Sequence, residues 1–148
     1  MTEHDPPLFA LLNEIGIIEQ LARNRFERAQ EDGLRLPHFA VLNHLVRLGD
    51  GRGPAQIARA FEVTKATMTN TLQRLEARGL VRLEDDARDG RAKRVFLTTE
   101  GRARREAAVT QTAADLAAIG AGLGTPPGAL LPGLRELRAM LDRSRNGF

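Results

Sequence analysis

The sequence predicts a mainly α-helical (α+β) protein that contains one two-stranded β-hairpin. Apolar residues recur at spacings of three and four in several segments, which is typical of helices with one buried face. Two short segments of alternating polarity, 80–83 and 93–97, flank a polar stretch with one glycine, which predicts a hairpin. The chain has 148 residues, so we expect one compact domain, or one domain with an arm that needs a partner.

The first three expected helices occupy the N-terminal part of the chain. The first covers residues 8–31, and Gly33 follows its end. The second begins near Pro37, because proline is favoured in the first turn of a helix. Its expected buried face consists of Phe39, Leu42, Leu45, Val46 and Leu48. A short third helix over residues 54–61 again begins with proline, and Ile57, Ala58 and Phe61 are its expected inward residues.

A fourth helix is expected over residues 65–78, directly after Thr64. Threonine is a favoured N-cap because its hydroxyl accepts a hydrogen bond from a free backbone N–H. Met68, Leu72 and Leu75 recur at helical spacing and are expected in the core. The third and fourth helices with their short connection predict a helix–turn–helix.

The C-terminal half contains the hairpin and two further helices. Thr98 or Thr99 is expected to cap a fifth helix that extends to about residue 119. Residues 116–134 carry no charge but include five Gly and three Pro, so we expect a helix end, a loop and the start of a sixth helix rather than a membrane span. The acidic N-terminus does not resemble a signal peptide, so we expect a cytoplasmic protein.

Composition excludes several kinds of site. The chain has no Cys and only three His, which excludes disulfides, thiolate metal sites and cysteine redox sensing and disfavours a histidine-rich metal centre. No Ser/His/Asp arrangement, glycine-rich phosphate loop or paired carboxylate points to catalysis, so we expect no enzyme activity and no cofactor.

The positive charge is concentrated in the middle of the chain. Residues 64–105 carry 11 basic and 6 acidic side chains, whereas residues 1–63 carry 7 and 9, and residues 106–148 carry 4 of each. A local basic surface is typical of phosphate binding. A solvated charged face is the alternative, so the charge needs a structural context.

The exposed face of the expected fourth helix carries side chains that can read DNA bases. Its outward positions are Lys65, Thr67, Thr69, Asn70, Thr71, Gln73 and Arg74. Asn and Gln can pair with adenine, Arg and Lys with guanine, and a Thr methyl can contact the thymine methyl. No acidic residue occurs from Thr64 to Arg74, which is unusual for an ordinary surface helix. Thr64 stabilises the helix as its cap in either case, and a DNA contact by Thr64 is an equal alternative.

The loop between the two expected strands is a second candidate DNA contact. Its tip is surrounded by Arg88, Arg91, Lys93 and Arg94. An Arg at the end of such a loop can enter the minor groove, where A·T tracts have an enhanced negative potential. Asp89 lies two residues before Arg91, close enough to hold its guanidinium. The alternative is a polar surface loop.

These segments resemble the MarR (multiple antibiotic resistance regulator) family of winged-helix repressors. The similarity covers LPHFAVLNHL, PAQIARAFEVTKATMTNTLQRLEARGLV and DARDGRAKRVFLTTEGR, the last with an Asp-x-Arg-Asp-x-Arg pattern followed by Leu-Thr-x-x-Gly. The terminal helices match by pattern only. The resemblance implies a winged helix-turn-helix with a two-stranded wing, flanked by N- and C-terminal dimerisation helices.

The resemblance also implies a function. It implies that the protein is a homodimer that binds a pseudo-palindromic operator in double-stranded DNA, with half-sites about 10 bp apart. The fourth helix would enter the major groove, and Arg91, steadied by Asp89, would enter the minor groove. Family members often release DNA when a small, commonly aromatic or phenolic, ligand enters a crevice between the dimer arm and the winged helix. His38 would lie near this crevice, although a surface or hydrogen-bonded histidine is the favoured alternative.

Three regions follow from this pattern. Residues 1–33 would form a dimerisation arm, residues 34–98 the DNA-binding domain, and residues 99–148 the C-terminal dimerisation helices. The terminal helices are apolar on a broad face that the central unit is too small to cover, so we expect a homodimer. The alternative is a monomer in which these helices pack on each other.

One residue departs from the family pattern, and one other function stays open. The turn before the fourth helix often has glycine where this chain has Glu62. A left-handed backbone is costly for Glu, so we expect a differently shaped turn.

The second function is an architectural or protein-binding winged-helix module without sequence-specific readout, which would need only Arg and Lys for phosphate contacts.

Overall fold

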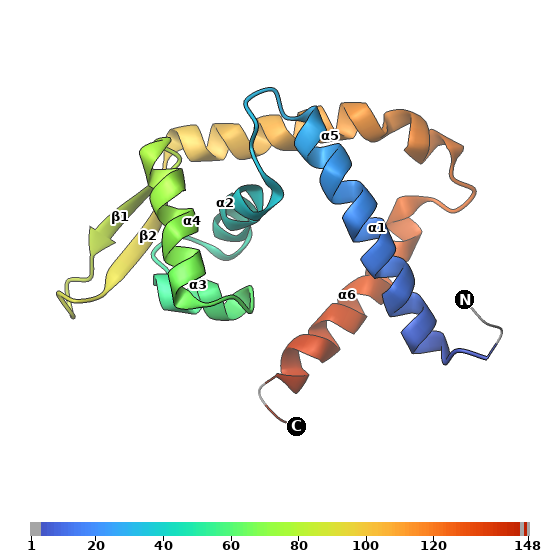
Figure 1. Ribbon diagram of the computed structural model, residues 1–148, viewed down its shortest axis with the longest axis horizontal. Coiled ribbons are helices and arrows are strands. Elements are labelled where there is room, and N and C mark those ends of the chain that lie inside the picture. Colours follow the sequence, from blue (N-terminus) through green and yellow to red (C-terminus); the bar gives the residue numbers. More distant parts are fainter. Residues whose placement is uncertain (1–3, 146, 148) are drawn as a thin grey trace. The chain divides into compact units, whose positions relative to one another are not determined.

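A computed structural model of the chain describes residues 4–145 and 147. The elements in order are α1 (Pro7–Ala29), α2 (Leu36–Leu48), α3 (Pro54–Ala60), α4 (Lys65–Ala77), β1 (Val81–Asp85), β2 (Lys93–Leu97), α5 (Thr99–Gly122) and α6 (Pro127–Ser144) (Figure 1). The chain divides into two compact units between Thr112 and Ala113, within α5. The predicted order of helices and strands is confirmed, with boundaries that differ by a few residues.

The helix starts follow local sequence rules. Proline occupies the first turn of α1, α2, α3 and α6, where its missing N–H leaves no hydrogen bond unmade. The predicted cap of α4 is confirmed, because the Thr64 hydroxyl accepts a hydrogen bond of 3.1 Å from the backbone N–H of Thr67. Thr98 does the same for α5, accepting a hydrogen bond of 2.9 Å from the N–H of Gly101.

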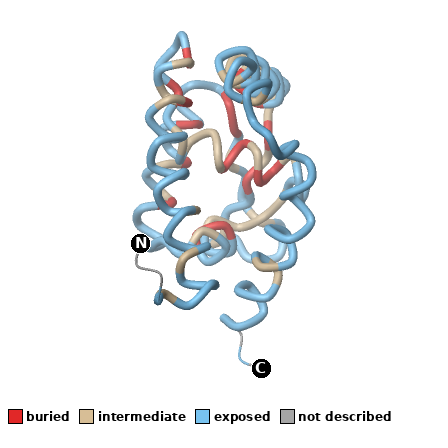
Figure 2. Tube along the Cα trace, turned by 90° about the vertical axis from the view of Figure 1, so that its right-hand side faces the viewer, coloured by how far each residue is buried: buried red, intermediate tan, exposed pale blue. Residues whose placement is uncertain are grey.

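The core of the first unit is built from α2, α3, α4 and the hairpin. Figure 2 shows the buried residues gathered in this part of the chain. The predicted core residues Met68, Leu72 and Leu75 of α4 are buried, as are Leu42 and Leu45 of α2 and Ile57 and Ala58 of α3. Phe39, Val46 and Phe61 are partly buried against the same cluster.

The expectation that Leu48 is buried is wrong. Leu48 is 49% exposed, although it lies three residues after Leu45, which is 2% exposed. The helix ends at Leu48, and the chain turns at Gly49, which has φ +100°. The covered face of α2 therefore does not extend to its last residue.

The hairpin packs one face on the core and exposes the other. The strands are antiparallel and pair Val81 with Leu97 and Leu83 with Val95. Val81, Val95 and Leu97 are buried. Arg52, in the connection from α2 to α3, forms a further β-bridge with Val95. The α2–α3 connection is thereby joined to the wing.

Gly101 allows the first turn of α5 to approach the hairpin closely. A Cβ atom at this position would lie 1.9 Å from the carbonyl oxygen of Leu80, which is far inside van der Waals contact. The backbone of α5 therefore rests directly on the start of the hairpin, and only glycine fits there.

The terminal helices leave most of their apolar side chains exposed. In α1 only Phe26 is buried, and in α6 no residue is buried. As predicted, the uncharged run 116–134 contains the end of α5 and the start of α6. Among the described residues, no helix has an apolar stretch sufficient to cross a membrane.

Candidate nucleic-acid interface

The exposed face of α4 begins at its capped N-terminus. Lys65, Thr67, Asn70 and Arg74 are exposed, as sequence analysis predicts for outward positions. Thr69 is only half-exposed, because it lies at the edge of the face that packs on the core. With Gln73 also exposed, α4 presents amide, ammonium and guanidinium groups and no carboxylate until Glu76.

Several threonine hydroxyls of α4 are already hydrogen-bonded within the helix. The Thr64 hydroxyl donates to Thr67 Oγ1 at 2.9 Å, and the Thr71 hydroxyl donates to the carbonyl oxygen of Thr67 at 3.1 Å. These protons are used locally, which leaves the methyl groups as the main outward feature. Base-edge hydrogen bonds would therefore come chiefly from Asn70 and Arg74.

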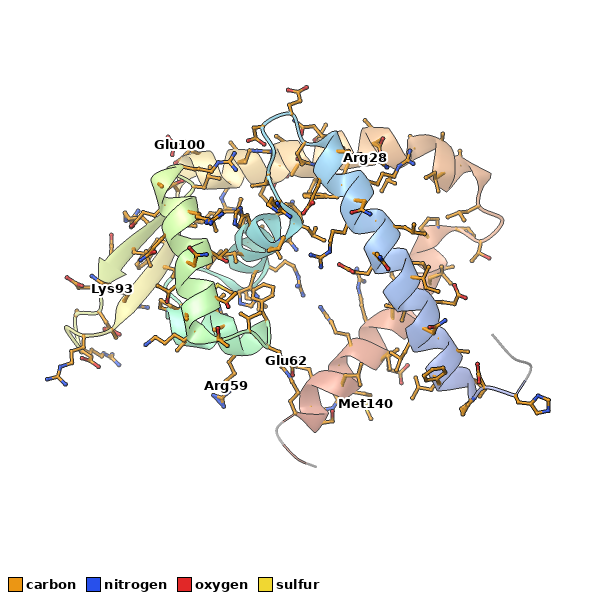
Figure 3. The ribbon with its side chains drawn as sticks, viewed as in Figure 1. Arg28, Arg59, Glu62, Lys93, Glu100 and Met140 are labelled. Atoms are coloured by element: carbon orange, nitrogen blue, oxygen red, sulfur yellow. The ribbon has the colours of Figure 1, made fainter. Side chains whose placement is uncertain are left out.

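The turn between α3 and α4 contains a residue with a left-handed backbone conformation. Glu62 has φ +53°, so the expectation of a differently shaped turn is wrong. Two hydrogen bonds enforce this conformation: Val63 N–H donates to Ala58 O at 3.0 Å, and Glu62 N–H donates to Arg59 O at 3.2 Å. This is the helix-terminating pattern that places its last residue in the left-handed region. Figure 3 shows Arg59 and Glu62 at this turn.

Two aspartates shape the tip of the wing. Asp86 Oδ1 accepts a hydrogen bond of 3.0 Å from the backbone N–H of Arg88, and Asp89 Oδ1 accepts one of 3.0 Å from the N–H of Arg91. The expected contact of Asp89 with the guanidinium of Arg91 is therefore replaced by a contact with its backbone. An Asp carboxylate commonly accepts a hydrogen bond from the backbone N–H two residues ahead in a tight turn. Arg88 and Arg91 are both exposed.

The first two residues of β2, Lys93 and Arg94, have polar partners within the first unit. Lys93, labelled on the hairpin in Figure 3, forms an ion pair of 2.5 Å with its cross-strand neighbour Asp85. Arg94 donates through Nε to the carbonyl oxygen of Gly51 at 2.8 Å. The charge of Lys93 is thus partly compensated, and Arg94 fastens the wing to the α2–α3 connection.

Sequence analysis missed a cluster on the outer face of the wing. The guanidinium of Arg82 lies 4.9 Å from the ring centroid of Phe96, and that of Arg94 lies 5.9 Å from it. Stacking of guanidinium on an aromatic ring is favourable. The signal was the alternation of strand residues, because residues 82 and 84 of one strand share a face with residues 94 and 96 of the other.

His38 lies in the first turn of α2 and is half-buried. Burial lowers its pKa, and the positive charges of Arg74, Arg78 and Arg35 lower it further. A hollow of about 480 Å³ is lined by Leu21, Asn24, Glu27 and Arg28 of α1, and one of about 200 Å³ is lined by Glu31, Asp32, Arg104, Ala107 and Gln111. His38 lines neither of these two hollows. Within the described residues, no group of three or more His, Asp or Glu side chains is arranged to hold a metal ion.

Comparison with known proteins finds one family. Residues 32–92 match the MarR family. The transcriptional regulator HosA of Escherichia coli is 40% identical over 88 residues, which represent 57% of this chain and 63% of HosA. The chain therefore spans less than two thirds of the length of this relative.

Solved structures share the fold over almost the whole chain. The crystal structure of MarR is similar with a TM-score of 0.82 and 23% identity, covering 100% of this chain and 99% of that chain. The regulator BpsR of Bordetella bronchiseptica is similar with a TM-score of 0.68 and 26% identity, covering 96% and 98%. Its structure concerns the regulation of DNA binding by 6-hydroxynicotinic acid. The predicted winged helix-turn-helix fold is confirmed.

Proposed function

We propose that this chain, whose residues 32–92 match the MarR family, is a homodimeric, sequence-specific DNA-binding transcriptional regulator. The observation that carries this proposal is the exposed face of α4, which is free of carboxylates over its first ten residues and lies beside a wing tipped with arginine. A short polar helix face of this kind fits the major groove.

In this proposal α4 reads bases and positions the protein on phosphates. Asn70 and Arg74 are the base-reading residues, and Thr67 and Thr69 supply methyl contacts to thymine. Lys65 and Thr64 lie at the N-terminus of α4, where the free N–H groups and the helix dipole attract a phosphate.

The wing supplies the second contact. Arg91 enters the minor groove, and Arg88 lies against a neighbouring phosphate. Asp89 acts through the backbone of Arg91, because its carboxylate fixes the turn that carries this side chain. Lys93 makes a weaker contact, since Asp85 already compensates its charge.

Dimerisation is proposed from the exposed apolar residues of the terminal helices. In α1, Leu8, Phe9, Ile18 and Leu21 are more than half exposed. In α6, Leu130 and Leu141 are at least half exposed. Large exposed apolar patches mark interaction sites. Residues 1–33 and 99–148 would therefore form the dimerisation regions, with residues 34–98 as the DNA-binding domain.

Ligand release is the finer part of the proposal. The DNA binding of the structural relative BpsR is regulated by a small aromatic acid. By analogy, a small aromatic or phenolic ligand would release this chain from its operator, so that the protein acts as a repressor. His38, half-buried at the start of α2, is the candidate ligand contact.

The alternative is a winged-helix module that binds DNA without sequence preference or binds protein. The exposed Glu62 beside α4 favours the protein-binding form of this alternative, because a carboxylate near the DNA surface repels phosphate. Base-reading residues such as Asn70 would then have no selective role.

The deciding experiment measures binding of the purified protein to the DNA upstream of its own gene and to a scrambled duplex of equal length, at two salt concentrations. A preference of about a thousandfold or more supports a specific regulator. Tight binding without preference supports the architectural alternative. Absence of binding to genomic fragments of any origin contradicts both DNA-binding functions.

Two variants separate the roles of the helix and the wing in the same assay. Asn70→Ala should cost roughly 1–3 kcal/mol on the specific duplex and little on the scrambled one. Arg91→Ala should weaken binding and lower the salt slope by about one unit. Arg23→Ala, which removes the same charge from α1, is the matched control. Equal losses for Asn70→Ala on both duplexes would reduce Asn70 to a positioning role, and an unchanged affinity for Arg91→Ala would refute the wing contact.

A further inference from the structure

A polar cluster away from the DNA-binding surface joins four parts of the first unit. We call it the Asp32 cluster, and its members are Gln30, Asp32, Arg78, Arg104 and Thr112. Asp32 accepts hydrogen bonds from Arg78 Nη2 at 2.6 Å and from Arg104 Nε and Nη2 at 2.7 and 2.5 Å. Arg104 Nη2 also donates to Gln30 Oε1 at 3.0 Å. One carboxylate thus holds two guanidinium groups from different helices.

The cluster is ionised and partly enclosed. The side chain of Arg104 is only 12% exposed, and Gln30 is buried. The hydrogen bond from Arg104 is the main reason that the pKa of Asp32 is lowered to about 2. The carboxylate therefore stays ionised throughout the physiological range, and the cluster acts as a fixed connection. A guanidinium that is taken out of water needs such a partner, because an unpaired buried charge is strongly destabilising.

Most members of the cluster lie at helix ends or in the connection between α1 and α2. Arg78 caps the C-terminus of α4, and Gln30 caps the C-terminus of α1. Gln30 Nε2 donates to the carbonyl oxygen of Phe26 at 3.1 Å and to Thr112 Oγ1 at 3.3 Å, which ties the end of α1 to α5. Asp32 lies in the connection from α1 to α2. The cluster therefore links the end of α4 to the end of α1 and to α5.

Two further hydrogen bonds near the C-terminus of α4 lie within the winged helix. Glu76 Oε2 accepts a hydrogen bond of 2.8 Å from the N–H of Leu83 in β1, and the Thr98 hydroxyl donates to the carbonyl oxygen of Gly79 at 2.6 Å. These bonds hold α4 on the hairpin whether or not Asp32 is present. The winged helix also contacts α1 and α5 through Phe26 and Ala108, which lie in the shared core, and through Arg105, which donates to Asn43 of α2. Loss of the cluster would therefore loosen the end of α4 against α1 and α5 without unfolding the winged helix.

We propose that Asp32, acting through Arg78 and Arg104, is a positioning residue that fixes the direction of α4 relative to α1 and α5 and so determines which half-site spacing the dimer accepts. This inference rests on the proposed function, in which α1 and α5 belong to the dimerisation regions. A helix of 13 residues is about 20 Å long, so a tilt of roughly 10° moves one end by about 3 Å. That displacement is close to the rise of one base pair, which is about 3.4 Å.

The first test varies the spacing between two identical half-sites by one base pair in each direction. The unaltered protein should prefer its best spacing by about tenfold. Arg78→Gln and Asp32→Asn should both reduce this preference to roughly threefold or less while they keep the preference for the half-site sequence. Arg23→Gln is the matched control, since its ion pair of 2.6 Å with Glu19 lies within α1 and connects no other element.

The two variants change the net charge in opposite directions, which separates positioning from phosphate contact. Arg78→Gln removes a positive charge and Asp32→Asn removes a negative one, so a purely electrostatic effect on DNA affinity would have opposite signs. A shared loss of spacing preference supports the proposal. An unchanged spacing preference in Asp32→Asn overturns it, as does a uniform loss of affinity in Arg78→Gln with a reduced salt slope. Arg78→Lys, which keeps the charge, should restore most of the preference.

A second test does not depend on DNA. The chain has no cysteine, so spin labels can be placed at Gln73→Cys on α4 and Thr110→Cys on α5, both exposed, with labelled and unlabelled chains mixed to isolate distances within one chain. Asp32→Asn and Arg78→Gln should widen the distance distribution, whereas Arg23→Gln should not. An unchanged distribution overturns the inference even if the protein proves to be a specific regulator. A widened distribution supports the positioning role of Asp32 even if the preference for operator DNA fails, in which case the part of the inference that concerns half-site spacing is contradicted.

Discussion

The winged helix buries its apolar side chains, whereas the two terminal helices, α1 and α6, leave most of theirs exposed. In the winged helix Leu42, Ile57 and Leu75 are 0% exposed. In α1, Leu21 is 66% exposed, and in α6 Leu130 is 53% exposed. The hydrophobic effect rewards apolar area removed from water, so the winged helix obtains its stability within the chain. For the exposed apolar residues of α1 and α6, we propose that a second copy of the chain supplies the covering surface.

The largest expected effect tests the exposed side of this comparison. The double substitution Leu130→Asp and Leu134→Asp places charges at positions i and i+4 of α6, which are 53% and 37% exposed. We expect a monomer by light scattering, together with a loss of operator affinity of roughly 10²–10⁴-fold, because two linked half-site contacts become one. Arg135→Asp, on the same helix, is the control and should remain dimeric. A dimer that survives the double substitution would remove α6 from the interface.

The next prediction tests the buried core of the winged helix. Leu42→Ala in α2 removes a fully buried side chain and should lower the free energy of unfolding by about 2–5 kcal/mol in a denaturant titration. Leu48→Ala is the matched control in the same helix, since this residue is 49% exposed and should cost no more than about 0.5 kcal/mol. Equal costs at both positions would mean that the C-terminal end of α2 is covered as fully as its middle, which would require a partner chain.

A smaller effect concerns strain inside the winged helix. Glu62→Gly should raise the free energy of unfolding by about 1 kcal/mol, because the left-handed backbone at φ +53° suits glycine and opposes a residue with a Cβ. Glu62→Ala is the control, since it removes the carboxylate but keeps the strain. Thermal denaturation should therefore show stabilisation for glycine only. If alanine stabilised the protein equally, charge rather than backbone strain would be the cause.

The smallest effect is a dependence of stability on pH through His44. This residue is buried in α2, with its ring 5.2 Å from that of Phe61, and burial followed by the charges of Arg52 and Arg47 lowers its pKa. The unfolded chain therefore binds a proton first as the pH falls through about 6.5, which destabilises the folded state.

The expected loss is at most about 0.7 kcal/mol between pH 7 and pH 6, measured as the difference between the unaltered protein and His44→Gln. The unaltered protein should lose stability faster than the variant as the pH falls. If the unaltered protein and His44→Gln lost stability equally as the pH falls, protonation of His44 would not destabilise the folded protein, and the prediction would be wrong.

Much of the fold and part of the candidate interface were predictable from local sequence. The period of the apolar residues defined the helices, and the Thr64 cap and the proline starts marked where they begin. The acid-free stretch from Thr64 to Arg74 identified the outward face of α4, because helix periodicity and charge are both local properties. The prediction that Leu48 is buried failed because periodicity assigns a residue to the apolar face of a helix but does not show where the residues that pack on this face end.

The sequence by itself determined which residues form each helix and strand, and which side of each element is apolar. Only the tertiary structure decided that Asp32 meets Arg78 and Arg104, that Arg94 reaches the carbonyl of Gly51, and that Glu62 keeps a left-handed backbone. Local patterns arise from contacts between residues three or four apart, which the order of the chain contains. Ion pairs between residues more than 40 positions apart arise only when packing brings distant segments together. The left-handed backbone of Glu62 is held by hydrogen bonds within the turn, which the residue types of the turn do not indicate.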